Sequence, residues 1–282
     1  MTYINITSGD MIGEEFSIQE EFMKKTALVT GASSGIGAAL SRLFAAEGYD
    51  LVLVARSRPE LDQLAAELSQ KYGISVTVLA KDLTLPASAG EIYEALETRL
   101  IPVDILANIA GFGTYGEFAS LDLKRELEMI QVDVVSMVQL TRLFLPGMLQ
   151  RGFGRILNVG STGSFAPVPL MSTYGGSKAF VLSFSEGLSE ELKGTPVRVT
   201  ALCPGVTRTG FQETARVNRV RLIRGPVMSA EQVARIGYKA LMHGQAVVVP
   251  GFANQLLAFS VRFTPRSMAR SLSRRMMEQE GS

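Results

Sequence analysis

The sequence predicts an α/β protein built on a doubly wound, seven-stranded parallel sheet with helices on both faces. Short runs rich in Val, Ile and Leu alternate with longer segments whose apolar residues recur at helical spacing, which is the pattern of successive βα units. The short runs are apolar throughout rather than at every second residue, so helices should cover both faces of the sheet. Right-handed crossovers between parallel strands then wind the sheet in both directions from one point.

Seven strands and six helices follow from this alternation. The strands are expected at 26–30, 51–55, 75–80, 103–108, 155–160, 197–203 and 246–249. The helices are expected at 36–48, 59–72, 87–100, 122–150, 173–193 and 230–242. Residues 204–228 break the alternation with glycines near both ends and five arginines, and predict a mobile lid over the carboxyl ends of the strands. Doubly wound sheets bind their ligands at that edge.

Composition excludes several classes of protein. The chain has 282 residues, of which 46% are hydrophobic, so it can fill a sizeable core and is not disordered outside its ends. With 28 basic and 27 acidic residues the formal net charge is +1, which argues against a basic nucleic-acid-binding protein. Cys203 alone forms no internal disulfide and His243 alone builds no multi-histidine cage, so no metal site is expected.

Both ends of the chain lie outside the predicted core. We expect an acidic leader at 1–23, one α/β domain at 24–250 and a basic tail at 251–282. The leader has no Lys or Arg before Lys24 and lacks the basic start of an export signal, which favours a cytoplasmic location. Arginines four residues apart in the tail give one basic helical face, compatible with a membrane surface or an acidic partner. Packing of the tail on its own domain or on a neighbouring subunit is the favoured alternative.

A glycine-rich turn follows the first predicted strand and opens a helix. It spans residues 30–37 and offers these residues to a ligand: Gly31, Ser33, Ser34, Gly35, Ile36 and Gly37. Glycines let backbone N–H groups approach a pyrophosphate closely, and the helix N-terminus adds partial positive charge. A tight turn with close helix–sheet packing would explain the same glycines, so this motif alone leaves both interpretations open.

Three polar residues, one directly after the fifth predicted strand and two on the helix that follows it, suggest a shared pocket. Tyr174 and Lys178 are four residues apart at the start of a helix, which places them on the same face. A lysine ammonium beside a phenol favours the phenolate and should lower the tyrosine pKa, making the phenol a usable proton donor near neutral pH. Ser161 directly follows the strand, thirteen residues before Tyr174, so all three should meet in one pocket.

Together these motifs resemble the short-chain dehydrogenase/reductase superfamily in its short, single-domain, Rossmann-like form. The resemblance covers about residues 24–250 and includes the glycine turn, Asp82-Leu83, Asn108-Ile109-Ala110-Gly111, Ser161, Tyr174 with Lys178, and Pro204-Gly205 with Thr207. It implies a nicotinamide cofactor across the strand ends. Asp82 would bind near the adenine with Leu83 beside it, Asn108, Ala110 and Gly111 would line the cofactor cleft, and Pro204, Gly205 and Thr207 would lie along the nicotinamide.

The same resemblance implies roles for the polar residues. Tyr174 would give its proton to a carbonyl oxygen, Ser161 would orient that oxygen, and Lys178 would bind the nicotinamide ribose. Members of the family pair through the helix that carries the tyrosine, which implies a homodimer or homotetramer.

Two positions depart from the family pattern. The smaller departure is Ile109, where the family usually has the second asparagine of Asn-Asn-Ala-Gly, and it affects packing more than chemistry. Where the family has a catalytic asparagine on the long helix before the fifth strand, this chain has Asp133. An ionised aspartate accepts a hydrogen bond from water in a proton relay but donates none. Near Lys178 it would favour the ammonium and weaken the positive field on Tyr174. We therefore expect Asp133 to shift the pH dependence of activity rather than abolish activity; an aspartate bonded to backbone or to a neighbouring arginine is the alternative.

The end of the second predicted strand bears on the choice of cofactor. Residues 54–58 include no acid that would bind a free ribose 2′-hydroxyl, whereas Arg56 offers a planar fork to a 2′-phosphate. NADP is therefore favoured over NAD as the cofactor. Ser33, Ser34 or Arg58 would help Arg56 to bind the phosphate. The alternative is that Arg56 or Arg58 is a solvated residue at a helix start.

The loops after the fourth and fifth strands indicate an apolar substrate. Nine residues gather there: Phe112, Tyr115, Phe118, Phe165, Pro167, Val168, Pro169, Leu170 and Met171. The sequence thus predicts an NADP-dependent oxidoreductase that interconverts a small-molecule ketone or aldehyde and its secondary alcohol. The alternative is a nucleotide-binding regulatory or redox-sensing protein with little catalysis, against which the intact Ser161, Tyr174 and Lys178 argue.

Overall fold

A computed structural model describes residues 24–215, 217, 220 and 227–278. Within these residues, seven strands form one parallel sheet: β1 (Thr26–Thr30), β2 (Asp50–Ala55), β3 (Val76–Ala80), β4 (Ile105–Asn108), β5 (Gly154–Val159), β6 (Val197–Leu202) and β9 (Val247–Val248). Their order in space is β3-β2-β1-β4-β5-β6-β9, so the chain winds outward in one direction from β1 and in the other from β4. The predicted doubly wound sheet is confirmed.

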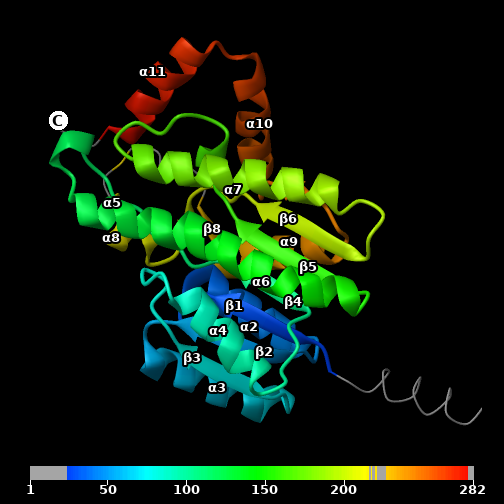
Figure 1. Ribbon diagram of the computed structural model, residues 1–282. Coiled ribbons are helices and arrows are strands. Elements are labelled where there is room, and N and C mark those ends of the chain that lie inside the picture. The colour runs from blue at the N-terminus through cyan, green and yellow to red at the C-terminus, as the bar shows by residue number, and fades with distance from the viewer. Residues whose placement is uncertain (1–23, 216, 218–219, 221–226, 279–282) are drawn as a thin grey trace, which may run out of the picture.

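Helices cover both faces of the sheet, as the continuous apolar strands require (Figure 1). On one face lie α2 (Gly35–Ala46), α3 (Arg58–Tyr72) and α9 (Ala230–Met242), and on the other α4 (Ser88–Glu97), α6 (Met137–Gln150) and α7 (Ser172–Glu191). Side chains of β1 alternate between the two layers, because successive residues of a strand point to opposite faces. Ala27 and Val29 pack in the first core, and Leu28 packs in the second.

The helix expected at 122–150 contains a local irregularity. It runs from Leu123 to Gln150 as α5 (Leu123–Ile130), a π-helical segment η2 (Gln131–Ser136) and α6. Among the described residues it is the one helix whose length and apolar composition would suffice to cross a membrane. It packs against α4 and β5, and 44% of its most apolar window is buried, as in the core helix of a sheet. The π-helical turn changes which side chains this helix directs at the sheet edge.

The described residues between β6 and α9 include a second, two-stranded sheet. It contains β7 (Thr207–Arg208), the short helix α8 (Phe211–Thr214) and β8 (Met228–Ser229), with β7 and β8 paired in parallel. The expected lid at 204–228 falls partly, and the acidic leader at 1–23 entirely, outside the described residues. The described part of this segment packs Ala215, Val217 and Val220 into a small apolar cluster with Met171.

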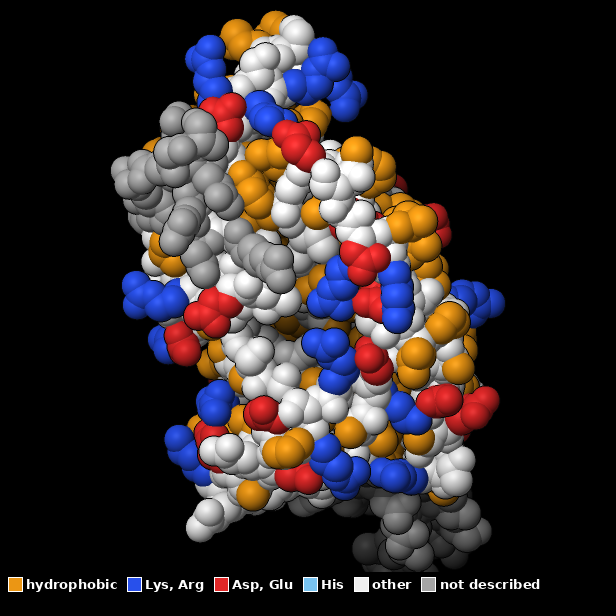
Figure 2. Space-filling model, turned by 90° about the vertical axis from the view of Figure 1, so that its left-hand side faces the viewer, with side chains coloured by type: hydrophobic (Ala, Val, Ile, Leu, Met, Phe, Trp, Pro, Cys, Tyr) orange, Lys and Arg blue, Asp and Glu red, His pale blue; other side chains and the backbone are white. Residues whose placement is uncertain are grey.

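The basic tail is helical and packs on its own domain, as the favoured alternative expects. It forms α10 (Phe252–Ser260), a short turn η5 (Val261–Phe263) and α11 (Arg266–Met277), which project together from one end of the molecule (Figure 1). The Tyr115 hydroxyl donates a hydrogen bond to the Met277 carbonyl at 2.6 Å, and Arg274 pairs with Glu117 at 2.9 Å. Figure 2 shows basic and apolar side chains gathered at this end.

Candidate active site

A cavity of about 550 Å³ lies along the carboxyl ends of the central strands. Loops after β1, β2, β3, β4, β5 and β6 contribute to its wall, together with α10 and α11. The cavity therefore crosses the place where the strand order reverses, between β1 and β4. An open α/β sheet leaves a crevice at that point because neighbouring connections run to opposite faces.

The glycine turn after β1 forms one end of the cavity. Gly31 has φ +65°, a conformation that costs little without a Cβ atom. A Cβ atom on Gly37 would lie 2.1 Å from the Gly31 carbonyl oxygen. This distance is too short for any side chain, so the position requires glycine. The turn thus folds tightly against the N-terminus of α2 and leaves its backbone open to a ligand. Of the two interpretations of this motif, the cavity at the turn favours binding of a pyrophosphate.

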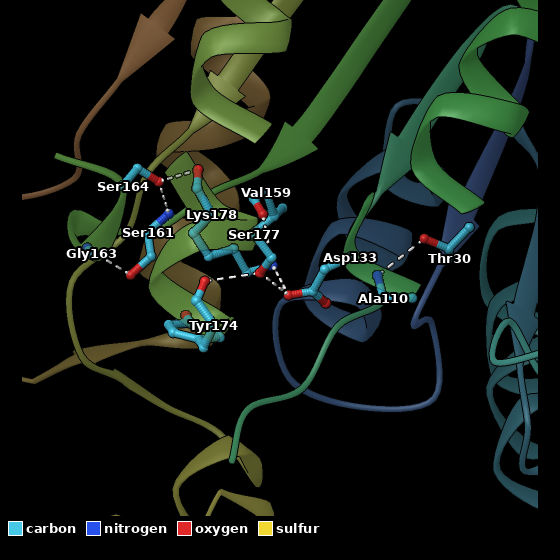
Figure 3. A network of polar contacts seen from close by, with 10 residues as sticks. All are labelled: Thr30, Ala110, Asp133, Val159, Ser161, Gly163, Ser164, Tyr174, Ser177 and Lys178. Carbon is cyan, nitrogen blue, oxygen red and sulfur yellow. Dashed lines mark hydrogen bonds and ion pairs between the residues drawn. The ribbon is translucent and has the colours of Figure 1, made fainter. Parts of the chain in front are cut away.

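Most of the residues expected to bind a cofactor lie in the wall of this one cavity. They come from five loops: Gly31, Ser33, Ser34, Gly35, Ile36 and Gly37; Arg56; Asp82 and Leu83; Ala110 and Gly111; Pro204, Gly205 and Thr207. The Thr30 hydroxyl accepts hydrogen bonds from the backbone N–H groups of Ile109 and Ala110, which fixes the loop after β4 beside the loop after β1. The bond from Ala110 is drawn in Figure 3.

Asn108 is the exception, and the expectation that it lines the cofactor cleft needs correction. It pairs in register with Asn158 on β5, and its amide donates to the Asn158 side-chain oxygen at 2.9 Å. Asn158 in turn donates to the Ser185 hydroxyl on α7. Because register partners point to the same face of a sheet, the Asn108 amide N–H meets the Asn158 side-chain oxygen between the two strands. Asn108 therefore ties β4 to β5 and lies outside the cavity wall.

Ser161 is held at the end of β5 by a short helical turn, η3 (Thr162–Ser164). Its hydroxyl accepts from the Gly163 N–H at 3.0 Å, and its own N–H donates to the Ser164 hydroxyl at 3.1 Å. The Ser164 hydroxyl donates to the Lys178 carbonyl at 2.7 Å, which couples this turn to α7. These reciprocal bonds fix the direction of Ser161 toward the cavity.

Tyr174 also lies in the cavity wall, and the surroundings of its phenol differ from the sequence-based expectation. Burial raises the pKa of Tyr174, and this outweighs the lowering by Lys178 and by a hydrogen bond with Ser161. The expected net lowering is therefore wrong, because desolvation of the phenolate exceeds the attraction of a cation whose charge Asp133 partly cancels. The phenol is protonated at neutral pH, which is the state that a proton donor needs.

Lys178 and Asp133 form a buried ion pair behind the phenol (Figure 3). Lys178 Nζ lies 3.2 Å from Asp133 Oδ2 and donates to the Val159 carbonyl at 3.2 Å. The two side chains are 7% and 0% exposed. Burial works to lower the pKa of Lys178, but the charge of Asp133 raises it above its ordinary value. Asp133 thus pairs with Lys178. The expected alternative of a bond to backbone holds in part, because a backbone hydrogen bond from Phe112 also lowers the pKa of Asp133, whereas no arginine pairs with it among the described residues.

Asp133 lies in the π-helical segment η2 and reaches Lys178 from there. Asp133 is the third residue of η2, and the Ser177 hydroxyl donates to its Oδ2 at 2.9 Å. Burial raises the pKa of Asp133, while Lys178 and Ser177 oppose that rise. The carboxylate lies beneath Gly111, where a Cβ atom would come within 2.6 Å of Asp133 Oδ1. Asp133 therefore acts on the cavity through Lys178 rather than from its wall.

The wall opposite the glycine turn is largely apolar. Of the residues expected at the substrate mouth, Phe112, Pro167, Val168 and Met171 line the cavity, whereas Phe118 lies on the surface. The sequence reasoning missed the contribution of the tail: Leu257, Ala258, Val261, Leu272, Met276 and Met277 complete this wall. The apolar residues between the tail arginines were the available signal, but nothing local in the sequence places them over the strand ends.

A family model of short chain dehydrogenases matches residues 25–219, which is more than half of the chain. The chain belongs to the short-chain dehydrogenase/reductase family. Members of this family include dehydrogenases and reductases.

Individual members of the family show how far the similarity extends. A very-long-chain 3-oxoacyl-CoA reductase from Anas platyrhynchos is 35% identical over 67% of this chain, and the chain spans 62% of that relative's length. A short-chain dehydrogenase from Sphingobium yanoikuyae, solved in complex with NADPH, is 32% identical with a TM-score of 0.76, covering 92% of this chain and 98% of its own. A family member from Burkholderia phymatum, solved with NAD, is 26% identical with a TM-score of 0.75, covering 86% and 93%.

The residues present in the cavity fit a dinucleotide. The close approach of Gly37 to Gly31 leaves backbone N–H groups exposed where a pyrophosphate would lie. Asp82, Gly111 and Thr207 extend the same wall from the loops after β3, β4 and β6 to the side chains of Tyr174 and Lys178. Such a cofactor, when bound, supplies or accepts the hydride, and the chain itself supplies the proton.

Proposed function

We propose that this protein is an NADP-dependent oxidoreductase that interconverts an apolar ketone or aldehyde and the corresponding secondary alcohol. One observation carries the proposal: Ser161, Tyr174 and Lys178 line a single cavity between a glycine cradle and an apolar wall. The cradle suits a dinucleotide, the three polar groups suit a carbonyl oxygen, and the apolar wall suits the rest of the substrate.

In the proposed reduction, the protein positions the carbonyl and provides its proton. The protonated Tyr174 phenol donates to the carbonyl oxygen, and the Ser161 hydroxyl, fixed by its bond from the Gly163 N–H, orients that oxygen. Lys178 lies 5.7 Å from the centre of the Tyr174 ring and stabilises the phenolate that proton donation leaves behind. In oxidation the phenolate accepts the proton, and each role reverses.

The apolar wall supports the proposed substrate class. Phe112, Val168, Met171, Leu257 and Leu272 line the part of the cavity beyond the polar groups. A 3-oxoacyl reductase among the named relatives supports a substrate with a long apolar part. We therefore expect kcat/KM to rise with the apolar area of the carbonyl compound, because each buried CH₂ group adds roughly 0.8 kcal/mol of binding.

A carbonyl panel tests the proposed function. NADPH oxidation, followed by its absorbance, would be measured with small diketones, 3-oxoacyl thioesters of increasing chain length and steroid ketones. We expect kcat/KM to be largest for long or bulky apolar ketones. NADPH binding without turnover of any carbonyl would reject the oxidoreductase and support a nucleotide-binding regulatory protein.

The redox-sensing form of that alternative has one observation against it. Cys203 is buried, and burial raises the pKa of its thiol to about 12. Redox sensors use accessible cysteines whose thiolate is populated near neutral pH. Cys203 packs instead with Leu182 and Ala201 in a small apolar cluster.

The position of Arg56 supports NADP as the cofactor. Arg56 is exposed at the end of β2 and lines the cavity beside Ser33, Ser34 and Ser57, with no acidic residue at this strand end. Arg58, in contrast, pairs with Asp62 at 3.4 Å. A guanidinium that is not engaged locally can hold a 2′-phosphate through paired hydrogen bonds.

We expect Arg56→Ala to weaken NADPH binding by about 10- to 100-fold, the effect of losing a charged hydrogen-bonding partner, and to leave NADH binding nearly unchanged. Arg58→Ala is the matched control and should alter neither dissociation constant more than a few-fold. Fluorescence titration with both nucleotides measures these constants. Wild-type protein that binds NADH as tightly as NADPH would contradict the preference.

We expect Asp133→Asn to move the pH dependence of turnover to lower pH. The charge of Asp133 raises the pKa of Tyr174, so its removal lowers that pKa. Reduction needs the protonated phenol and declines as pH rises through its pKa, so the alkaline limb of kcat should appear at lower pH in the variant. Asp62→Asn, at an exposed position on α3, is the control. Superimposable profiles for Asp133→Asn and wild type would contradict a role for this charge.

A further inference from the structure

The tail presents a surface that the proposed reaction does not use. We call residues 251–277, comprising α10, η5 and α11, the C-terminal arm. Phe252, Leu256, Phe259 and Phe263 recur every three or four residues along its first helix and turn, and are between 56% and 81% exposed. The rings of Phe259 and Phe263 contact each other with centroids 5.1 Å apart. Single exposed apolar residues are ordinary, but four on one helix face form a patch that marks an interaction site.

The same arm is strongly cationic. Arg262, Arg266 and Arg270 are exposed beside the apolar patch, and none forms an ion pair within the described residues. Arg274 is engaged with Glu117 and fastens the arm to its domain. The sequence contains no Asp or Glu from 232 to 277. The arm therefore combines an apolar face with uncompensated positive charge at a projecting end of the molecule (Figures 1 and 2).

The opposite side of the arm closes the cavity. Leu257 and Val261 on the first half, and Leu272 and Met276 on α11, line the apolar end of the active-site cavity. Leu272 is also half exposed, so it reaches both the cavity wall and the outer surface. The arm thus lies between the active site and the solvent with apolar side chains on both sides.

We propose that the C-terminal arm docks on a bilayer surface with anionic headgroups, and that apolar substrate passes along the arm between bilayer and cavity. Helices that combine large apolar side chains with basic ones insert the apolar face at the headgroup boundary and bring the arginines to the lipid phosphates. The docking proposal depends only on the residues of the arm and not on the proposed function. The passage of substrate rests in addition on the proposed function, because it requires an apolar carbonyl substrate.

A second copy of the chain suits this surface less well than a membrane does. In a twofold contact the same patch faces itself, which brings the arginines of one arm against those of the other. No acidic residue of the arm offsets that repulsion. An anionic bilayer supplies the opposite charge together with an apolar layer for the phenylalanines.

Co-sedimentation with vesicles tests the docking. The full chain would be mixed with vesicles of phosphatidylcholine alone, and of phosphatidylcholine with phosphatidylglycerol. We expect binding to the anionic vesicles that weakens as salt increases. Arg262→Ala/Arg266→Ala/Arg270→Ala should lower the partition coefficient on the order of 100-fold at low salt, given the usual contribution of each basic residue. Phe259→Ser/Phe263→Ser should also abolish stable binding.

Matched controls remove exposed arginines and exposed apolar side chains outside the arm. Arg99→Ala/Arg142→Ala/Arg235→Ala changes three exposed arginines outside the arm, and Leu85→Ser/Leu100→Ser removes two exposed leucines. Both controls should bind anionic vesicles like wild type. Activity on a water-soluble ketone should be unchanged in every one of these variants, since none of the altered residues lines the cavity.

The outcomes separate the two proposals. Turnover of a soluble ketone by protein that stays in the supernatant with both kinds of vesicle would overturn docking and leave the proposed function standing. Vesicle binding that needs the arm, without turnover of any carbonyl, would support docking and reject the reductase. A third outcome would also overturn the proposal. The arm variants would differ from wild type in sedimentation coefficient without vesicles, while all proteins would bind vesicles equally. This result would show that the arm is a subunit interface.

Discussion

Tyr174→Phe is expected to lower turnover with NADPH by about 10²- to 10⁴-fold, the usual contribution of a positioned proton donor. The phenol is the one protonated acid that the structure places in the cavity wall beside Ser161 and Lys178, among the described residues. Phenylalanine keeps the ring, which packs against Phe211 at a centroid distance of 5.4 Å, and removes only the acid. The dissociation constant for NADPH should change little, so the loss should appear in kcat.

Tyr93→Phe is the control for removal of a phenol. Tyr93 lies on α4 and packs against Phe144, away from the cavity wall, so its variant should keep wild-type turnover. Steady-state kinetics with the best substrate of the carbonyl panel, and a separate NADPH titration, measure both effects. A Tyr174→Phe enzyme within a few-fold of the wild-type rate would rule out Tyr174 as the proton donor.

Lys178→Met is expected to destabilise the folded protein by about 3–5 kcal/mol, because it leaves a buried carboxylate without its cation. The Asp133 side chain is fully buried, and its ionised form depends on Lys178 and on the Ser177 hydroxyl. Methionine matches the length of the lysine side chain but offers no charge. Turnover should be lost as well, since the phenolate of Tyr174 would have no neighbouring cation.

A second variant distinguishes the loss of stability caused by breaking the ion pair from the loss caused by altered packing. Asp133→Asn/Lys178→Met removes both charges, so it should recover part of the stability that Lys178→Met loses. Lys193→Met breaks an exposed pair with Glu190 and should cost less than about 1 kcal/mol. Urea unfolding of the four proteins gives the free energies. A double variant no more stable than Lys178→Met would show that the pair does not account for the loss.

The strands and the glycine turn were predictable because their signals are local. Continuous apolar runs at 26–30 and 155–160 indicate buried strands wherever they occur in a chain, and both form within one residue of the expected ends. The turn at 30–37 carries its own conformational requirement, since Gly37 must approach Gly31 at any such strand-to-helix junction. Tyr174 and Lys178 share a helix, so their spacing alone places them together.

Asn108 shows where a role implied by the family resemblance was not found. Its side chain bonds to Asn158, fifty residues later, on the neighbouring strand, and does not line the cavity. The pair could be recognised only once the register of β4 and β5 was known.

By itself, the sequence determined the fold class, the order of the strands along the chain, the glycine turn and the identity of the polar residues at the strand ends. Those properties depend on residues close together in the chain. The tertiary structure alone decided that Asp133 reaches Lys178 from a π-helical segment, that burial raises the pKa of Tyr174, and that the C-terminal arm closes the cavity. Desolvation and contacts between distant segments depend on how the whole chain packs, and no short stretch of sequence encodes them.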